Sequence, residues 1–391
     1  MADSTPRFIL FLPSVPSPPT ISSLKSSFGD TVSQVLKEVA SHSADSSSAA
    51  ILEIALACPK LVGQKFAARS TLFKELQLSL AAVYKLICII AAKDGVNVED
   101  RDGVDVRVIP VAWSEQGEAD SATTTGPIAS LQMLARSGRQ WQYAFGVESQ
   151  AGEAMVKAFV AAKKESQHDH GEAQDTTEPS SSMQEDGRGG IAKHHHVAVG
   201  GTFDHLHIGH KLLLTMTIFA VDERSTENRS ATIGITGDQL LVNKKHAEVL
   251  ESWSERQCSV QDFLDSILRF STAETQISKV DNPGPNGKSV YIHYHDLIVK
   301  CTEIQDPFGP TITEERISAL IISGETRSGG KAVNDKRKEK GWAELEVFEV
   351  DVLDADEDDG GEAKEGFTNK ISSTAIREKL ARQTEGARSK V

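Results

Sequence analysis

The stretch from Val197 to His210, VAVGGTFDHLHIGH, constrains the fold more than any other part of this 391-residue chain. Its first three residues are apolar and mostly β-branched, which is typical of a buried strand. The two glycines that follow allow a tight turn and a close approach of the backbone to a ligand. From Leu213 onward, apolar residues recur at helical spacing. The stretch therefore predicts a strand, a glycine turn and a helix N-terminus, whose free N–H groups favour phosphate.

Residues 191–391 continue this alternation of strands and helices, which predicts an α/β domain with a doubly wound parallel sheet. Ligands of such sheets bind at the carboxyl ends of the strands, so residues that follow the strands should share one cleft. A turn-rich loop is expected at 281–288, an acidic surface insertion at 355–366, and a last helix within 371–380. The further strands are expected at 231–236, 289–293, 317–322 and 345–352.

Residues 1–165 predict a second α/β module, because apolar strand-like runs again alternate with helical spacing. No catalytic motif stands out there, so the expected role is structural or regulatory. Residues 166–190 are polar and acidic, which predicts a flexible linker. We therefore expect the domain at 191–391 to fold and act without residues 1–190. The N-terminal strands are expected at 8–12, 51–57 and 104–111, and the helices at 72–92, 128–134 and 152–162.

Charge and composition narrow the partners and the location. A formal net charge of −14 argues against a general nucleic-acid binder. The apolar run at 8–12 is too short for a signal peptide, and the run at 83–92 is too short to span a bilayer. We expect a protein of the cytoplasm, with the nucleus as the alternative. A histidine tract at 194–196 can bind metal, but alternate side chains of a strand point to opposite faces, so no metal site is expected.

The segments GGTFDHLHIGH, at 200–210, and ISSTAIR, at 371–377, together resemble phosphopantetheine adenylyltransferases of the eukaryotic and archaeal kind. These belong to the nucleotidyltransferase superfamily with an HxGH motif, and the resemblance covers residues 195–382. It implies a Rossmann-like nucleotidyltransferase fold. It also implies transfer of AMP from ATP to 4′-phosphopantetheine, with Mg²⁺ bridging the ATP phosphates. The products would be dephospho-coenzyme A and pyrophosphate.

The resemblance assigns a role to each matching residue. His210 and Thr202 would contact the α-phosphate in the transition state, and Thr202 would also contact phosphopantetheine. Lys244 would bind the phosphopantetheine phosphate and stabilise the transition state, with the adjacent Lys245 as the alternative. The residues that would bind ATP are Gly201, Thr202, Phe203, His207, His210, Glu325, Ser372, Ser373, Thr374 and Arg377.

Two other functions stay open. The chain could be another adenylyl- or cytidylyltransferase of the same superfamily, or a catalytically silent subunit that binds nucleotide or acts as a scaffold. A GKS sequence at 287–289 resembles the end of a P-loop, but Asn282 stands where the leading glycine belongs, which predicts a surface turn. The kinase step on dephospho-coenzyme A is therefore expected of a separate protein. That kinase or other coenzyme A pathway enzymes are the expected protein partners.

Overall fold

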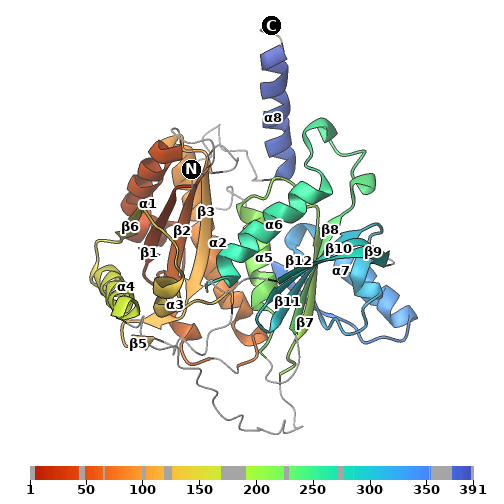
Figure 1. The fold of residues 1–391 in the computed structure, drawn as a ribbon, viewed down its shortest axis with the longest axis horizontal. Helices are drawn as coiled ribbons and strands as arrows, with labels where there is room; N and C mark the ends of the chain where they lie inside the picture. Colours follow the sequence, from red (N-terminus) through yellow and green to blue (C-terminus); the bar gives the residue numbers. More distant parts are fainter. Residues whose placement is uncertain are drawn as a thin grey trace.

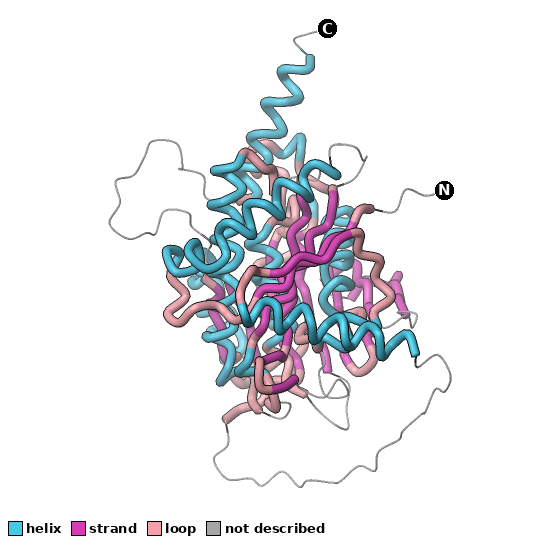
Figure 2. The backbone as a smooth tube through the Cα atoms, turned by 90° about the vertical axis from the view of Figure 1, so that its left-hand side faces the viewer, coloured by secondary structure: helices cyan, strands magenta, loops and turns pink. Residues whose placement is uncertain are grey.

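Two large sheets organise the chain, the first parallel and the second mostly parallel, each with helices packed against it (Figure 1). Figure 2 shows the strands in the interior with helices around them. The computed structural model describes residues 5–43, 49–64, 67–98, 103–118, 126–168, 191–223, 229–270, 276–284, 286–351, 353 and 372–388. The predicted acidic insertion at 355–366 lies outside the described residues, as does 169–190 of the predicted linker.

The N-terminal domain is built on a four-stranded parallel sheet in the order β3-β2-β1-β6. Three of its strands were predicted, whereas β6 and the long helix α1 were not. β6 is a short edge strand with partly exposed side chains, and serines dilute the apolar spacing of α1. The elements are β1 (Arg7–Leu12), α1 (Ile21–Ser43), β2 (Ala50–Ala57), α2 (Ser70–Asp94), β3 (Val104–Val111), β4 (Trp113–Ser114), β5 (Gly117–Glu118), α3 (Leu131–Arg136), β6 (Tyr143–Gly146) and α4 (Gln150–His168).

The second domain contains a seven-stranded sheet in the order β13-β12-β7-β8-β11-β10-β9. From β13 to β11 all neighbouring strands are parallel, and the chain order reverses between β7 and β12. This reversal creates the crevice in which doubly wound sheets bind ligands. The elements are β7 (His196–Gly201), α5 (Ile208–Phe219), β8 (Arg229–Thr236), α6 (Trp253–Leu268), β9 (Gln276–Gly284), β10 (Gly287–Tyr294), β11 (Leu297–Ile304), β12 (Ala319–Ser323), α7 (Arg327–Glu339), β13 (Glu346–Val350) and α8 (Ser373–Arg388).

The expectation that residues 289–293 form the third parallel strand was wrong. Residues 289–293 belong to β10, which runs antiparallel to both β9 and β11, and the third parallel strand is β11. The expected loop at 281–288 is largely the β9–β10 hairpin, whose turn depends on Gly287 at φ +87°. The GKS sequence therefore opens a strand and does not lie between a strand and a helix, as a P-loop would. In the N-terminal domain, the helix expected at 128–134 begins only at Leu131.

The two domains share a core. One cluster of buried apolar side chains includes Leu36 and Ile109 of the N-terminal domain and Leu212 and Phe263 of the second. Helices α5 and α6 lie between the second sheet and β3, and α2 packs against α5 (Figure 1). By length and composition α2 could cross a membrane, but 56% of its most apolar window is buried inside the protein, as in a core helix. The shared core argues against our expectation that residues 191–391 fold alone.

Candidate active site

A cavity of about 610 Å³ lies at the carboxyl ends of the parallel strands, at the reversal between β7 and β12. Apart from the alternative Lys245, every site residue named from the sequence lines this cavity, although the residues come from four separate segments of the chain. The sheet brings these segments together because each one follows a parallel strand or begins a helix at the same edge. These residues are Gly201, Thr202, Phe203, His207, His210, Lys244, Glu325, Ser372, Ser373, Thr374 and Arg377.

His207 and His210 form a stacked pair at the N-terminus of α5. Their ring centroids are 3.9 Å apart and the ring planes are inclined by 24°. His207 occupies the N-cap position, but its side chain makes no capping hydrogen bond. A side chain at Gly209 would crowd the imidazole, since a Cβ there would lie 3.2 Å from the His207 ring. The glycine of HxGH therefore makes room for the pair.

Neither histidine is positively charged at neutral pH. Burial, assisted by the nearby charge of Lys211, lowers the pKa of His207 from 6.5 to about 3. Burial also lowers the pKa of His210 well below its usual value. Within the described part of the chain, Nδ1 of each ring is buried and has no hydrogen-bond partner. Such a buried polar atom is costly unless it is satisfied, so a ligand in the cavity could supply the missing contact.

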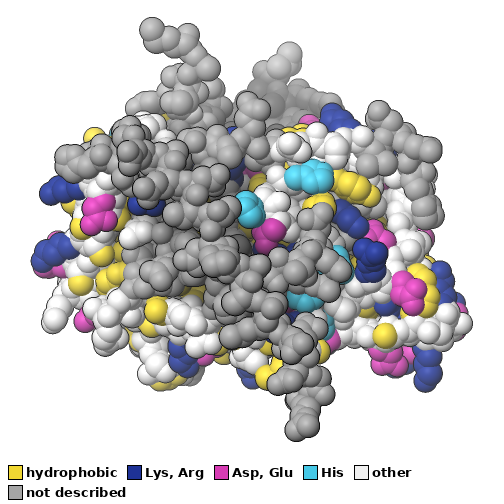
Figure 3. Space-filling view, turned by 60° about the horizontal axis from the view of Figure 1, so that its bottom comes forward, with side chains coloured by type: hydrophobic (Ala, Val, Ile, Leu, Met, Phe, Trp, Pro, Cys, Tyr) yellow, Lys and Arg dark blue, Asp and Glu magenta, His cyan; other side chains and the backbone are white. Residues whose placement is uncertain are grey.

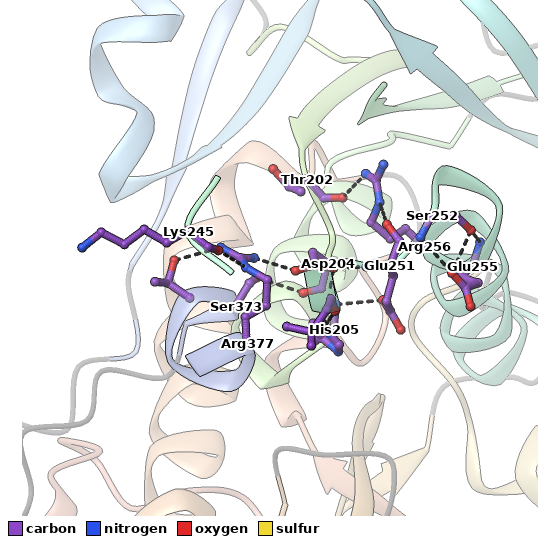
Figure 4. A network of polar contacts seen from close by, with 12 residues as sticks. Thr202, Asp204, His205, Lys245, Glu251, Ser252, Glu255, Arg256, Ser373 and Arg377 are labelled. Carbon is purple, nitrogen blue, oxygen red and sulfur yellow. Dashed lines mark hydrogen bonds and ion pairs between the residues drawn. The ribbon is translucent and has the colours of Figure 1, made fainter. Parts of the chain in front are cut away.

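The loop before α5 is joined to the start of α8 by a buried ion pair. Arg377 Nη1 lies 2.6 Å from Asp204 Oδ2, and both side chains are at most 3% exposed. Ser373 Oγ donates to the Asp204 carbonyl oxygen at 2.9 Å, and Arg377 Nε donates to the Lys245 carbonyl oxygen at 3.0 Å. Figure 4 shows Asp204 between Arg377 and Glu251. Arg377 thus holds the first and last motifs together as well as lining the cavity.

Arg256 organises the other side of this loop. It is fully buried, and its guanidinium donates to the carbonyl oxygens of Thr202, Thr236 and Glu251 at 2.7 to 3.0 Å. It also pairs with Asp238 Oδ1 at 2.6 Å. The side chain therefore joins the glycine turn to the segment that follows β8 (Figure 4).

No sequence pattern assigned a site role to Arg256, Asp204 or Glu251. A signal did mark the start of α6, because Ser252 and Glu255 form a capping box. It predicts where the helix begins, but not that an arginine one residue later is buried. Asp204 stands inside the predicted motif, yet its ion pair bridges 173 positions of the chain and has no local sequence signal.

Lys244 and Lys245 occupy one exposed turn after β8 but differ in direction. Lys244 lines the cavity, whereas Lys245 is not among its lining residues. In Figure 4 the Lys245 side chain extends away from Arg377 and Asp204. Glu325 is exposed in a short 3₁₀ turn that follows β12 and also lines the cavity. The geometry therefore favours Lys244 of the two lysines.

The histidine tract at the start of β7 does not gather into a metal-binding cluster. His194 lies between Ser318 and Glu346, whereas the ring of His196 contacts Ser230. Several histidine side chains are visible on the face shown in Figure 3. Over the residues that the structure describes, no group of three or more His, Cys, Asp or Glu side chains could hold a metal ion.

Two family profiles match the chain, one for each domain. Residues 1–183 match a domain of unknown function, DUF8446. Residues 198–379 match a profile described as Cytidylyltransferase-like, and they contain the whole cavity. The first match ends within the predicted linker at 166–190, and the second begins eight residues after that linker ends.

Individual relatives give a more specific likeness. The chain is 38% identical over 186 residues to an uncharacterized protein of Schizosaccharomyces pombe, covering 47% of this chain and 48% of that protein. It is 36% identical over 188 residues to the phosphopantetheine adenylyltransferase of Saccharomyces cerevisiae, covering 48% and 49%. It is 31% identical over 181 residues to that of Thermococcus gammatolerans, covering 46% and 86%. The match thus spans about half the length of the two yeast proteins.

Proposed function

Because the chain belongs to the phosphopantetheine adenylyltransferase-like family of nucleotidyltransferases, we propose that it transfers AMP from ATP to 4′-phosphopantetheine. The products are dephospho-coenzyme A and pyrophosphate. One observation carries the proposal: residues from four segments, including two histidines with unpartnered Nδ1 atoms, line a single cavity at the carboxyl edge of the sheet. Such a cavity suits two phosphate-bearing substrates that must be brought together.

In the proposed reaction, an oxygen of the phosphopantetheine phosphate attacks the α-phosphorus of ATP in line with the leaving pyrophosphate. The new P–O bond forms as the bond to the β-phosphate breaks. The attacking phosphate is already anionic, so the step needs no covalent enzyme intermediate and no strong base. Catalysis then depends on placing the two substrates and on stabilising charge around the α-phosphorus.

Each residue has a proposed task. Thr202 and the neutral His210 donate hydrogen bonds to the α-phosphate oxygens, and His207 helps to hold the phosphates. Lys244 neutralises the acceptor phosphate. The N-terminus of α8 binds the β- and γ-phosphates through N–H groups and the hydroxyls of Ser372 and Thr374. Arg377 keeps this helix end against the glycine turn through Asp204.

Mg²⁺ would enter with ATP, bound to the nucleotide phosphates. The donor groups fit this mode, because the phosphate side of the cavity is lined by hydroxyls, imidazoles and Lys244, which suit phosphate oxygens. The ion would neutralise charge on the leaving pyrophosphate. The protein residues would orient the phosphates to which the ion is bound.

The test is pyrophosphate release by the purified chain with ATP and Mg²⁺, with and without 4′-phosphopantetheine. Release that requires both substrates supports the proposal. A parallel reaction with CTP tests the sister activity that the cytidylyltransferase-like profile allows. Measurable ATP binding without release would favour a silent nucleotide-binding scaffold or a different acceptor.

His210→Ala provides the matching variant. It removes a transition-state donor, so turnover should fall at least about 100-fold. Circular dichroism and thermal unfolding should show an unchanged fold. Near-normal turnover in a folded variant would exclude the role assigned to His210.

A further inference from the structure

We propose that the N-terminal domain is a fixed support of the transferase site, and that its Asp105 positions the histidine-bearing helix α5 through an ion pair with Lys211. The proposal gives a role to the domain that matches only a family of unknown function. Its activity readout rests on the function proposed above, whereas its spectroscopic readout does not.

Lys211 directly follows His210 in the first turn of α5. Its side chain is 7% exposed and points into the N-terminal domain. Nζ lies 2.5 Å from Asp105 Oδ1 and 3.0 Å from the Val106 carbonyl oxygen, both on β3. A lysine buried this deeply is costly without such partners. The contacts therefore fix the end of the helix from which His207 and His210 face the cavity.

Asp105 is itself held in place by its own domain. Arg107, two residues later on β3, donates to Asp105 Oδ2 through Nε at 2.9 Å and Nη2 at 2.6 Å. Burial opposes the charge of Asp105, but Lys211 and Arg107 outweigh it and hold the pKa of this carboxyl well below its usual range. Asp105 is thus an ionised anchor on β3.

The N-terminal domain also contacts a second part of the cavity lining. Gln77 of α2 is buried, and its Nε2 donates to Asp351 Oδ2 at 3.0 Å. Asp351 follows β13 and lines the cavity. Near it, the rings of Phe73 and Phe348 pack with centroids 4.9 Å apart. The domain therefore contacts the site at the histidine helix and again at the end of β13.

A second interdomain ion pair offers a matched control. Arg69 Nη2 lies 2.8 Å from Glu223 Oε1, with side chains 5% and 8% exposed. Glu223 lies just beyond the C-terminal end of α5, away from the histidines. Breaking this pair tests loss of domain contact as such, because Glu223 does not line the cavity.

The experiment compares Asp105→Asn with Glu223→Gln in the full chain. Turnover of Asp105→Asn should fall at least about 10-fold while KM for ATP stays within about threefold, because small misplacements of catalytic groups chiefly slow the chemical step. Glu223→Gln should lose comparable thermal stability yet keep kcat within about twofold. Asp105→Glu, which retains the charge, should recover most of the lost turnover.

Histidine NMR supplies a readout that needs no turnover. The signals of His207 and His210 among the 12 histidines can be assigned with single His→Gln variants. Asp105→Asn should shift both signals, whereas Glu223→Gln should leave them unchanged. If the wild-type chain shows no transferase activity, the proposed function fails, and these signals still decide whether Asp105 positions the histidines.

Lys211→Met keeps the test decisive if Asp105→Asn does not fold. Methionine fills a similar volume without a buried charge, and Asp105 keeps its pairing with Arg107. Lys211→Met should fold and show the same loss of turnover and the same histidine shifts. The proposal is overturned if a folded variant at either position keeps wild-type turnover and histidine signals, or if Glu223→Gln matches Asp105→Asn in all readouts.

Discussion

Of the two adjacent lysines after β8, Lys244 has a side chain that lines the cavity, whereas the side chain of Lys245 does not. Lys244→Ala should lower kcat/KM for phosphopantetheine about 100-fold, because it removes a cation from the acceptor phosphate and the transition state. Lys245→Ala should change it less than about threefold, since that side chain contributes no group to the cavity. Steady-state kinetics with varied acceptor measures both. A larger loss in Lys245→Ala would reverse the assignment.

The buried histidines should also leave a mark on stability against pH. The pKa of His207 is about 3 in the folded protein and 6.5 is its ordinary value, so between these pH values the unfolded chain binds more protons. Stability should therefore be complete above about pH 6.5 and fall with decreasing pH towards 3, by up to ~1.4 kcal/mol per pH unit for this group.

His207→Gln tests this dependence because glutamine does not titrate. Urea unfolding between pH 4.5 and 7.5 should give a shallower loss of stability for the variant than for the wild type. A control variant at the exposed His295 should keep the wild-type slope, since its side chain is 95% exposed. Equal slopes for wild type and His207→Gln would show that His207 is not held neutral by burial.

At the scale of elements, local patterns predicted most helices and strands, but not the order of strands or long-range polar contacts. The run at 289–293 has a strand pattern, and nothing local distinguishes an antiparallel hairpin strand from the parallel strand β11 that follows. The cavity residues named from the sequence were predictable because their motifs resemble those of a known family and stand at strand ends or helix starts. Arg256 was not, because the burial of its guanidinium depends on loops that meet only in the folded chain.

Arg256 therefore allows a prediction about how elements are joined. Arg256→Met should lower the free energy of unfolding by ~2–4 kcal/mol, because several buried carbonyl oxygens lose their donor. Arg256→Lys should recover only part of this, since one ammonium cannot reproduce the planar fork of donors. Urea unfolding measures both. Arg382→Met, on the exposed surface of α8, should stay close to wild type. Equal stability of Arg256→Lys and wild type would contradict the assigned contacts.

At the scale of the whole molecule, the sequence suggested two independent units and the structure shows one shared core. A composition change and a polar stretch predict a boundary between two units of the chain. They carry no information about which apolar faces remain for a partner domain. All of α5 from Lys211 to Phe219 is buried, and part of that burial comes from α2 and β3. A helix apolar on all sides is the sequence feature that could have indicated this packing.

The chain that lacks residues 1–190 should consequently be insoluble or should unfold without cooperativity. Removal of residues 1–190 exposes the faces of α5 and α6 that pack on α2 and β3. It also leaves Lys211 without its partner Asp105. Co-expression of residues 1–168 and 191–391 as separate polypeptides should restore a soluble complex, because the described interface is apolar and includes the ion pairs Arg69–Glu223 and Lys211–Asp105. Size-exclusion chromatography and thermal unfolding distinguish these states. A soluble 191–391 fragment with cooperative unfolding and full turnover would show that the second domain holds its own site without the first.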